Sequence, residues 1–215
     1  TDEETFIRFR PFERFLHVLV MTSFLLLVAT GMPLKFYYTD WAKGMVHWIG
    51  GLEAAAQLHR LGAIITFTYF ALHIGSLVRA AYRNRAQYRN PRSGRFSIRE
   101  FLGHVFGPDL PYPHIQDLKD WWAHQKWFFG RGPQPQFDKW TYWEKFDYMA
   151  VFWGVAVIGI SGLVMWFPEF FTKLLPGWII NVALIVHSDE ALLAAGFIFA
   201  FHFFNVHFRP EKFPI

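Results

Sequence analysis

The sequence contains no cysteine in its 215 residues. Disulfides, cysteine-ligated iron–sulfur clusters and covalently attached haem, which needs a C-x-x-C-H motif, are therefore excluded. Charged residues are also scarce, at 18% of the chain, whereas 53% of the residues are hydrophobic and 20% are aromatic. A soluble domain of this length has too little interior to hide so many aromatic side chains. If the chain holds a redox centre, histidine must carry it.

Four long apolar runs account for this composition. Each is close to or above the ~18–20 residues that cross a bilayer as a helix. The first run is too long for the apolar core of a cleaved signal peptide, and no A-x-A site follows it. We expect an all-α integral membrane protein, a single four-helix bundle in which Pro33 follows the end of the first helix. The expected helices are at about 12–32, 54–80, 145–167 and 178–207, with a long connection at about 81–144.

The distribution of basic residues predicts the orientation in the membrane. Seventeen of the 21 Lys and Arg residues fall in three places: three before residue 15, twelve from Arg79 to Lys145, and two after residue 208. The positive-inside rule therefore predicts that both termini and the 81–144 segment are cytoplasmic. A basic segment that contains tryptophan also suggests nucleic acid, but contact with anionic lipid headgroups is the better explanation in a membrane protein.

Histidines recur inside the apolar runs at helical spacings. His59 and His73 are 14 residues apart, which places them within about 40° of one helix face and about 21 Å apart along the axis. His187 and His202 are 15 residues apart, which places them within about 60° of one face and about 22 Å apart. His17 lies near the start of the first helix. With antiparallel neighbours, His59 and His187 fall at an outer level, and His17, His73 and His202 at an inner level. Two levels of facing imidazoles suit two haems stacked across a bilayer.

Each histidine taken alone also has a simpler role open to it. A single histidine in a membrane helix often hydrogen-bonds a neighbouring helix. Zinc needs three or four ligands within a few ångströms, which two separated levels do not provide. Intramembrane ionisable residues are functional candidates, and Arg60 at the outer level and Arg14 at the inner level are candidate partners for haem propionates. His104, His114 and His124 are expected on the surface of the 81–144 segment.

Several stretches of the chain resemble a known family. "FERFLHVLVMTSFLLLVATGMP", "LHRLGA" and "VHSDEALLAAGFIFAFH" resemble the first, second and fourth helices of the membrane cytochrome b subunits of formate dehydrogenase, nickel–iron hydrogenase and thiosulfate reductase. "YWEKFDYMAVFWG" and "VHSDEALLA" are similar to a branch that is associated with multihaem cytochrome c partners. The similarity covers the four expected helices.

The resemblance implies two haem b groups and specific axial ligands. Carried over, His59 pairs with His187 at the outer haem, and His17 pairs with His202 at the inner haem. Two features depart from the family pattern: His73 is an additional inner-level histidine, and the spacing from His187 to His202 is 15 rather than 14. His73 is thus an alternative inner ligand, and a third haem is a further alternative.

The family also binds a quinone near the inner haem, at the beginning of the third helix. The corresponding stretch here is residues 138–148, where Thr141 and Trp143 replace polar residues of the family. A flat apolar slot, hydrogen-bond donors and a proton route are the requirements of such a site. An aromatic interfacial belt explains the same residues equally well. The candidate quinone residues are Tyr142, Trp143, Glu144 and Lys145.

These observations predict an electron-transfer subunit of a quinone-linked oxidoreductase complex in a bacterial inner membrane. It would connect the menaquinone or ubiquinone pool with an outer-face redox partner. The partner expected from the resemblance is a multihaem cytochrome c, or the iron–sulfur, molybdenum or hydrogenase subunits of a larger enzyme. Two alternatives stay open: a self-contained transmembrane haem b reductase, and a non-redox anchor or transporter whose histidines line a proton path.

Overall fold

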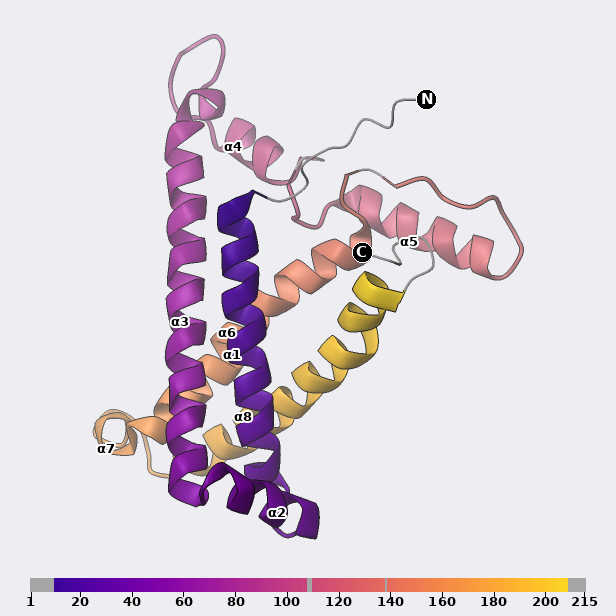
Figure 1. The fold of residues 1–215 in the computed structure, drawn as a ribbon. Helices are drawn as coiled ribbons and strands as arrows, with labels where there is room; N and C mark the ends of the chain where they lie inside the picture. Colours follow the sequence, from indigo (N-terminus) through magenta and orange to yellow (C-terminus); the bar gives the residue numbers. More distant parts are fainter. Residues whose placement is uncertain (1–9, 108–109, 138, 209–215) are drawn as a thin grey trace. The chain divides into compact units, whose positions relative to one another are not determined.

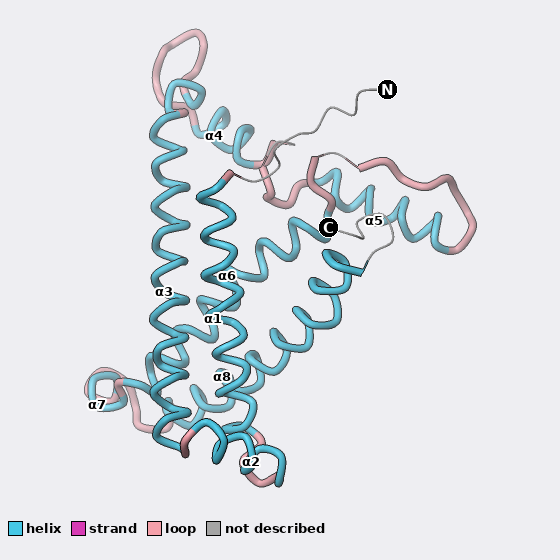
Figure 2. The backbone as a smooth tube through the Cα atoms, in the orientation of Figure 1, coloured by secondary structure: helices cyan, strands magenta, loops and turns pink. Residues whose placement is uncertain are grey.

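The protein is all-helical in the part that the structure, a computed structural model, describes: residues 10–107, 110–137 and 139–208. Within these ranges there is no strand, only an isolated antiparallel bridge between Arg89 and Phe96 (Figure 2). Arg8, Arg209 and Lys212, which contribute to the charge distribution, lie outside the described residues.

Four helices are long and apolar enough to cross a membrane, as expected for a multi-pass membrane protein. They are α1, α3, α6 and α8, and the last continues without interruption into the π-helical segments η2 and η3 (Figure 1). Their bounds are Pro11–Lys35 for α1, Leu52–Arg83 for α3, Tyr142–Trp166 for α6, Ile179–Phe197 for α8, Ile198–His202 for η2 and Phe204–Phe208 for η3.

Shorter elements connect the long helices. The helix α2 (Asp40–Ile49) ends at Gly50, whose φ of 109° lies in the left-handed region that favours glycine. The first helix continues through Pro33 to Lys35, so the expectation that this proline lies beyond the helix was wrong. The others are η1 (Arg85–Tyr88), α4 (Ile98–Val105), α5 (Ile115–Phe128) and α7 (Pro168–Phe171).

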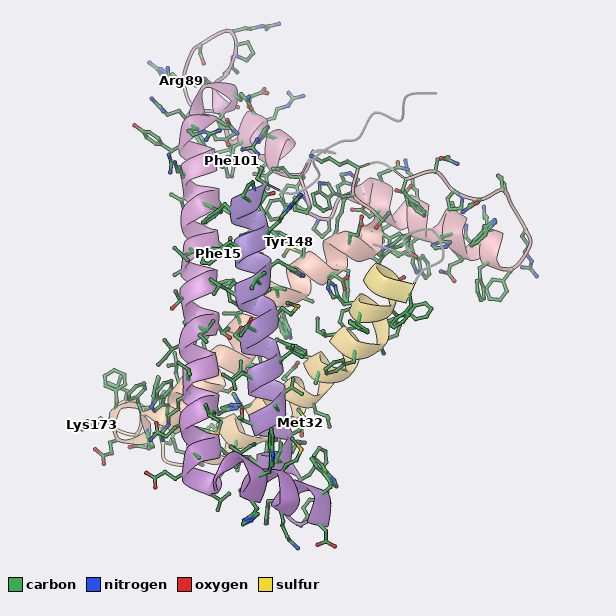
Figure 3. All side chains as sticks on the ribbon, in the orientation of Figure 1. Phe15, Met32, Arg89, Phe101, Tyr148 and Lys173 are labelled. Carbon is green, nitrogen blue, oxygen red and sulfur yellow. The ribbon has the colours of Figure 1, made fainter. Side chains whose placement is uncertain are left out.

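The chain divides into two compact units, residues 1–76 with 154–215, and residues 77–153. In the first unit, small residues lie where the helices meet. Ser23 and Thr30 of α1 are 1% exposed, and a Cβ added at Gly62 of α3 would meet the Leu27 side chain of α1 at 3.0 Å. Large apolar side chains are exposed instead, such as Phe15 of α1, labelled in Figure 3, at 52% exposure. Close backbone approach through small residues with an apolar exterior is typical of helices packed in lipid.

The second unit contains the short helices that precede α6. Ser97 caps α4 by accepting a hydrogen bond from the backbone N–H of Glu100. Tyr88 is buried against this helix, with ring centres 5.3 Å from Phe101 and 5.4 Å from His104. The segment expected as a plain connection therefore has helices and a small core of its own.

We predict that Gly62→Val weakens the contact between α1 and α3, because its side chain would overlap Leu27. Overpacking of this kind costs about 1–3 kcal/mol. Gly75→Val is the matched control, since an added Cβ there meets nothing within 4 Å on the same helix. Unfolding in mixed detergent micelles measures both, and equal destabilisation would contradict the close approach at Gly62.

Candidate functional site

Two pairs of histidine rings face each other in the first unit. The ring centres of His59 (α3) and His187 (α8) are 6.1 Å apart, and those of His17 (α1) and His202 (η2) are 6.4 Å apart. The first pair joins the two histidines that the helical spacing placed at one level, and the second is the inner pair that the resemblance implies. His73 lies on α3 with a partly buried side chain.

The separations suit a metal held between two imidazoles. Metal–nitrogen bonds of about 2.0 Å, and about 1.2 Å from each nitrogen to its ring centre, place two axial rings about 6.4 Å apart. Both observed separations lie close to this value. The described residues contain no group of three or more His, Cys, Asp or Glu side chains that would bind a metal ion alone. Paired imidazoles without further ligands fit haem iron, which receives its other four ligands from the porphyrin, better than zinc.

Backbone and hydroxyl groups fix the tautomer of the outer pair. The Nδ1 of His187 is 2.8 Å from the carbonyl oxygen of Ile158. A carbonyl only accepts, so Nδ1 must carry the proton and Nε2 keeps a free lone pair. The Nδ1 of His59 is 2.9 Å from Thr30 Oγ1, whose hydroxyl donates to the carbonyl of Leu26 and therefore accepts from His59. A hydrogen bond of this kind from Nδ1 is typical of histidines that bind a metal through Nε2.

Each outer histidine contacts a hydroxyl residue and the glycine that follows it on a neighbouring helix. Thr30 and Gly31 on α1 face His59, and Ser161 and Gly162 on α6 face His187. A Cβ added at either glycine would lie 3.0 Å from Cε1 of the ring, so any larger residue would push the imidazole by a few tenths of an ångström. The Ser161 hydroxyl, at 3.4 Å from His187 Nδ1, makes the weaker of the two hydroxyl contacts.

A change of helical pitch brings His202 to the inner level. In a uniform α-helix, the 15-residue spacing leaves His202 about 60° away from the face of His187. The segment η2 is π-helical and ends at His202. A π-helix turns by roughly 80–85° per residue, so these five residues reduce the offset to about 30°. The π segment therefore absorbs the additional residue and directs His202 toward His17.

Further contacts tie α8 to α1 around the two levels. The ammonium of Lys35, the last residue of α1, donates to Asp189 Oδ1 at 2.6 Å and to Ser188 Oγ at 3.1 Å, directly after His187. Between the levels, the ring centres of Phe24 and Phe199 are 5.8 Å apart. These contacts hold α1 and α8 together over the length that separates the two histidine pairs.

The two candidate propionate partners have different surroundings. The Arg60 guanidinium lies 5.6 Å from the centre of the Trp166 ring, so it makes a cation–π contact at the level of His59. Arg14 lies exposed in the first turns of α1.

In the second unit, the four candidate quinone residues form the first turn of α6, and their side chains make contacts that stabilise it. Thr141 and Glu144 form a capping box, in which Glu144 Oε2 accepts from the backbone N–H and the hydroxyl of Thr141 at 3.0 and 2.9 Å. Tyr142 and Trp143 pack around His124, with Tyr142 Oη 3.0 Å from His124 Nδ1 and the Trp143 ring centre 5.5 Å from that of His124. His124 therefore belongs to an aromatic cluster rather than to the open surface.

The ammonium of Lys145 is buried in an ion pair with α5. Lys145 is 2% exposed, and its Nζ donates to Asp117 Oδ1 at 2.7 Å. Its Nζ also lies 3.4 Å from Nε2 of His114, whose side chain is only 17% exposed. The expectation that His114 lies on the surface was thus wrong. Nothing local in the sequence indicated this cluster, because Asp117 and Lys145 are 28 residues apart.

Comparisons with protein-family models, with curated proteins and with solved structures gave no match to this chain. Its functional assignment therefore depends on the residues described above.

We predict that Lys145→Met alone destabilises the protein by about 3–5 kcal/mol, because it leaves the buried Asp117 carboxylate without the ammonium that balances its charge. The double variant Asp117→Leu/Lys145→Met should recover part of this loss, since apolar residues replace a buried ion pair at little cost, although the capping hydrogen bond from the His114 backbone N–H to Asp117 is lost. Unfolding of the two single variants, Lys145→Met and Asp117→Leu, and of the double variant in mixed micelles measures the coupling free energy between the two side chains. Additive effects of the two substitutions would contradict a direct buried pair.

Proposed function

We propose that the chain is a di-haem cytochrome b subunit that carries electrons across a membrane. The observation that carries the proposal is the pair of facing histidine couples, His59 with His187 and His17 with His202, at ring separations of 6.1 and 6.4 Å. Bound haem supplies reversible one-electron chemistry at its iron. The chain's own residues would hold the haem through imidazole nitrogens of fixed tautomer in an apolar surrounding.

The two levels are separated along the helices by a distance suited to transmembrane transfer. From His187 to His202 the helix rises about 20 Å, which is most of the ~30 Å hydrocarbon core. Electrons accepted at the outer level would thus move to the inner level within a single subunit. In this proposal the inner level and both termini are cytoplasmic, as the basic residues favour, and the membrane is the bacterial inner membrane.

We further propose that electrons are exchanged with quinone at the inner level and with a redox protein at the outer face. The partner is a multihaem cytochrome c or the redox subunits of a formate dehydrogenase or hydrogenase type of enzyme. The 138–148 stretch stays the proposed quinone site. All four candidate residues have structural partners there: Glu144 bonds Thr141, Lys145 pairs with Asp117, and Tyr142 and Trp143 contact His124.

Spectroscopy of the purified chain tests the proposal. Two haem b per chain should be extracted by acid–acetone and should give b-type bands with dithionite. Reoxidation by a soluble quinone analogue then tests the quinone step. The double variant Asp117→Leu/Lys145→Met, if it folds with both haems, separates the roles of Lys145, since unchanged reoxidation assigns this residue to structure alone. Absence of haem would leave the anchor or transporter as the function.

We predict that His59→Ala and His187→Ala each reduce the haem content from two to one per chain and spare the same remaining haem. His17→Ala should remove that remaining haem, because loss of one axial imidazole opens the iron and releases the macrocycle. His73→Ala is the control, as a histidine of the same membrane helix as His59 that should leave two haems.

Haem extraction with low-temperature difference spectra distinguishes the outcomes. Loss of the inner haem in His73→Ala but not in His17→Ala would overturn the inner pairing. Loss of different haems from these two variants would indicate a third haem.

We also predict that deletion of Ala200 keeps both haems. Ala200 is an exposed residue of the π segment, and its removal allows a regular α-helix with a 14-residue spacing, within about 40° of one face. Insertion of one alanine after Ala200 should remove the inner haem, because it turns His202 further away from His17. Loss of the inner haem on deletion, with retention on insertion, would contradict the role of the π segment.

A further inference from the structure

The helix α5 is held across the end of a membrane-spanning helix. Asp117 and His124, seven residues apart and about 10.5 Å along α5, contact Lys145 and Tyr142 of α6. Those two residues are three positions apart, or about 4.5 Å along α6. If α5 ran parallel to α6, its contacts would extend over similar lengths of both helices. The contacts extend over more than twice the length on α5, so α5 crosses the first turn of α6 at a steep angle (Figure 1). The axis of α5 is therefore directed along the plane of the membrane surface rather than through it.

The side of α5 away from these contacts is an exposed apolar stripe. At 100° per residue, Ile115, Leu118 and Trp122 lie about 100–160° around the helix from Asp117, and Phe129, which caps the helix directly after its last residue, follows at about 120°. They are 77, 70, 56 and 68% exposed, in that order. Four large apolar side chains on one face of a helix at a membrane boundary require a covering that is itself apolar.

Basic residues border this stripe. Lys119 and Lys126 project about 180–200° from Asp117, on one edge of the apolar face, and the Lys126 ammonium lies 5.8 Å from the centre of the Trp122 ring. Tryptophan concentrates at the level of lipid headgroups, and lysine extends from such positions toward lipid phosphates. An apolar stripe with tryptophan and a lysine edge suits an anionic bilayer surface.

We propose that α5 is an interfacial helix, whose stripe of Ile115, Leu118, Trp122 and Phe129 lies in the headgroup region of the bilayer that α6 crosses. The Asp117–Lys145 ion pair and the His124 cluster fix the rotation of α5, so that the stripe cannot turn away from the lipid. This proposal concerns the membrane surface and holds whether or not the chain binds haem.

The absence of cysteine makes the test direct. Leu118→Cys and Gln116→Cys each carry a nitroxide label in the otherwise unchanged chain, reconstituted in vesicles with anionic lipid. Gln116 is the matched control, because it is exposed on α5 about 130° away from the centre of the stripe. Power-saturation EPR measures collisions with oxygen, which concentrates in lipid, and with a water-soluble nickel chelate.

We expect the oxygen-to-nickel collision ratio to be at least about threefold higher at position 118 than at position 116, because only the stripe enters the lipid. Ile115→Cys repeats the measurement, should Leu118→Cys fold poorly. Equal ratios at 118 and 116 would overturn the proposal in favour of a solvated face. Protection of position 118 from both reagents would overturn it in favour of a protein partner.

Discussion

An imidazole buried among apolar helices must have a partner at each ring nitrogen. In this protein one ring nitrogen of each outer histidine has a partner on a neighbouring helix. The Nδ1–H of His187 donates to a backbone carbonyl, and the Nδ1–H of His59 donates to a hydroxyl group. The opposite nitrogens are thereby left as lone pairs on rings that face each other. Two lone pairs cannot satisfy each other, and the iron of the proposed haem would accept both.

The pair of a hydroxyl residue and a following glycine, which contacts an outer histidine, occurs on two different helices. Thr30–Gly31 and Ser161–Gly162 each combine a hydroxyl, which bonds its own helix one turn back, with a glycine that admits the ring. The sequence shows no internal repeat, because the similarity is limited to two residues on each of two helices. It becomes visible only when α1 is placed against α3 and α6 against α8.

Much of the architecture follows from hydropathy and helical arithmetic. The four spans and the pairing of His59 with His187 could be predicted, because both depend on periodicity within single helices. The Thr141–Glu144 capping box was also readable from the sequence, as T-Y-W-E before an apolar run. Two features were not predictable. The ion pair of Asp117 with Lys145 joins distant segments, and the 15-residue spacing from His187 to His202 does not by itself show that a π segment changes the rotation per residue.

The fixed tautomers also separate electron transfer from proton transfer. A histidine in a proton path must take up a proton at one nitrogen and release it from the other. The Nδ1–H of His187 is bonded to the carbonyl of Ile158, which accepts a hydrogen bond but cannot take the proton onward. A proton that reached Nε2 would have no exit through the ring. The same hydrogen bond holds the imidazole in one orientation. A fixed orientation is an advantage for a metal ligand and an obstacle for a proton relay, so it favours the proposed haem binding over a histidine proton path.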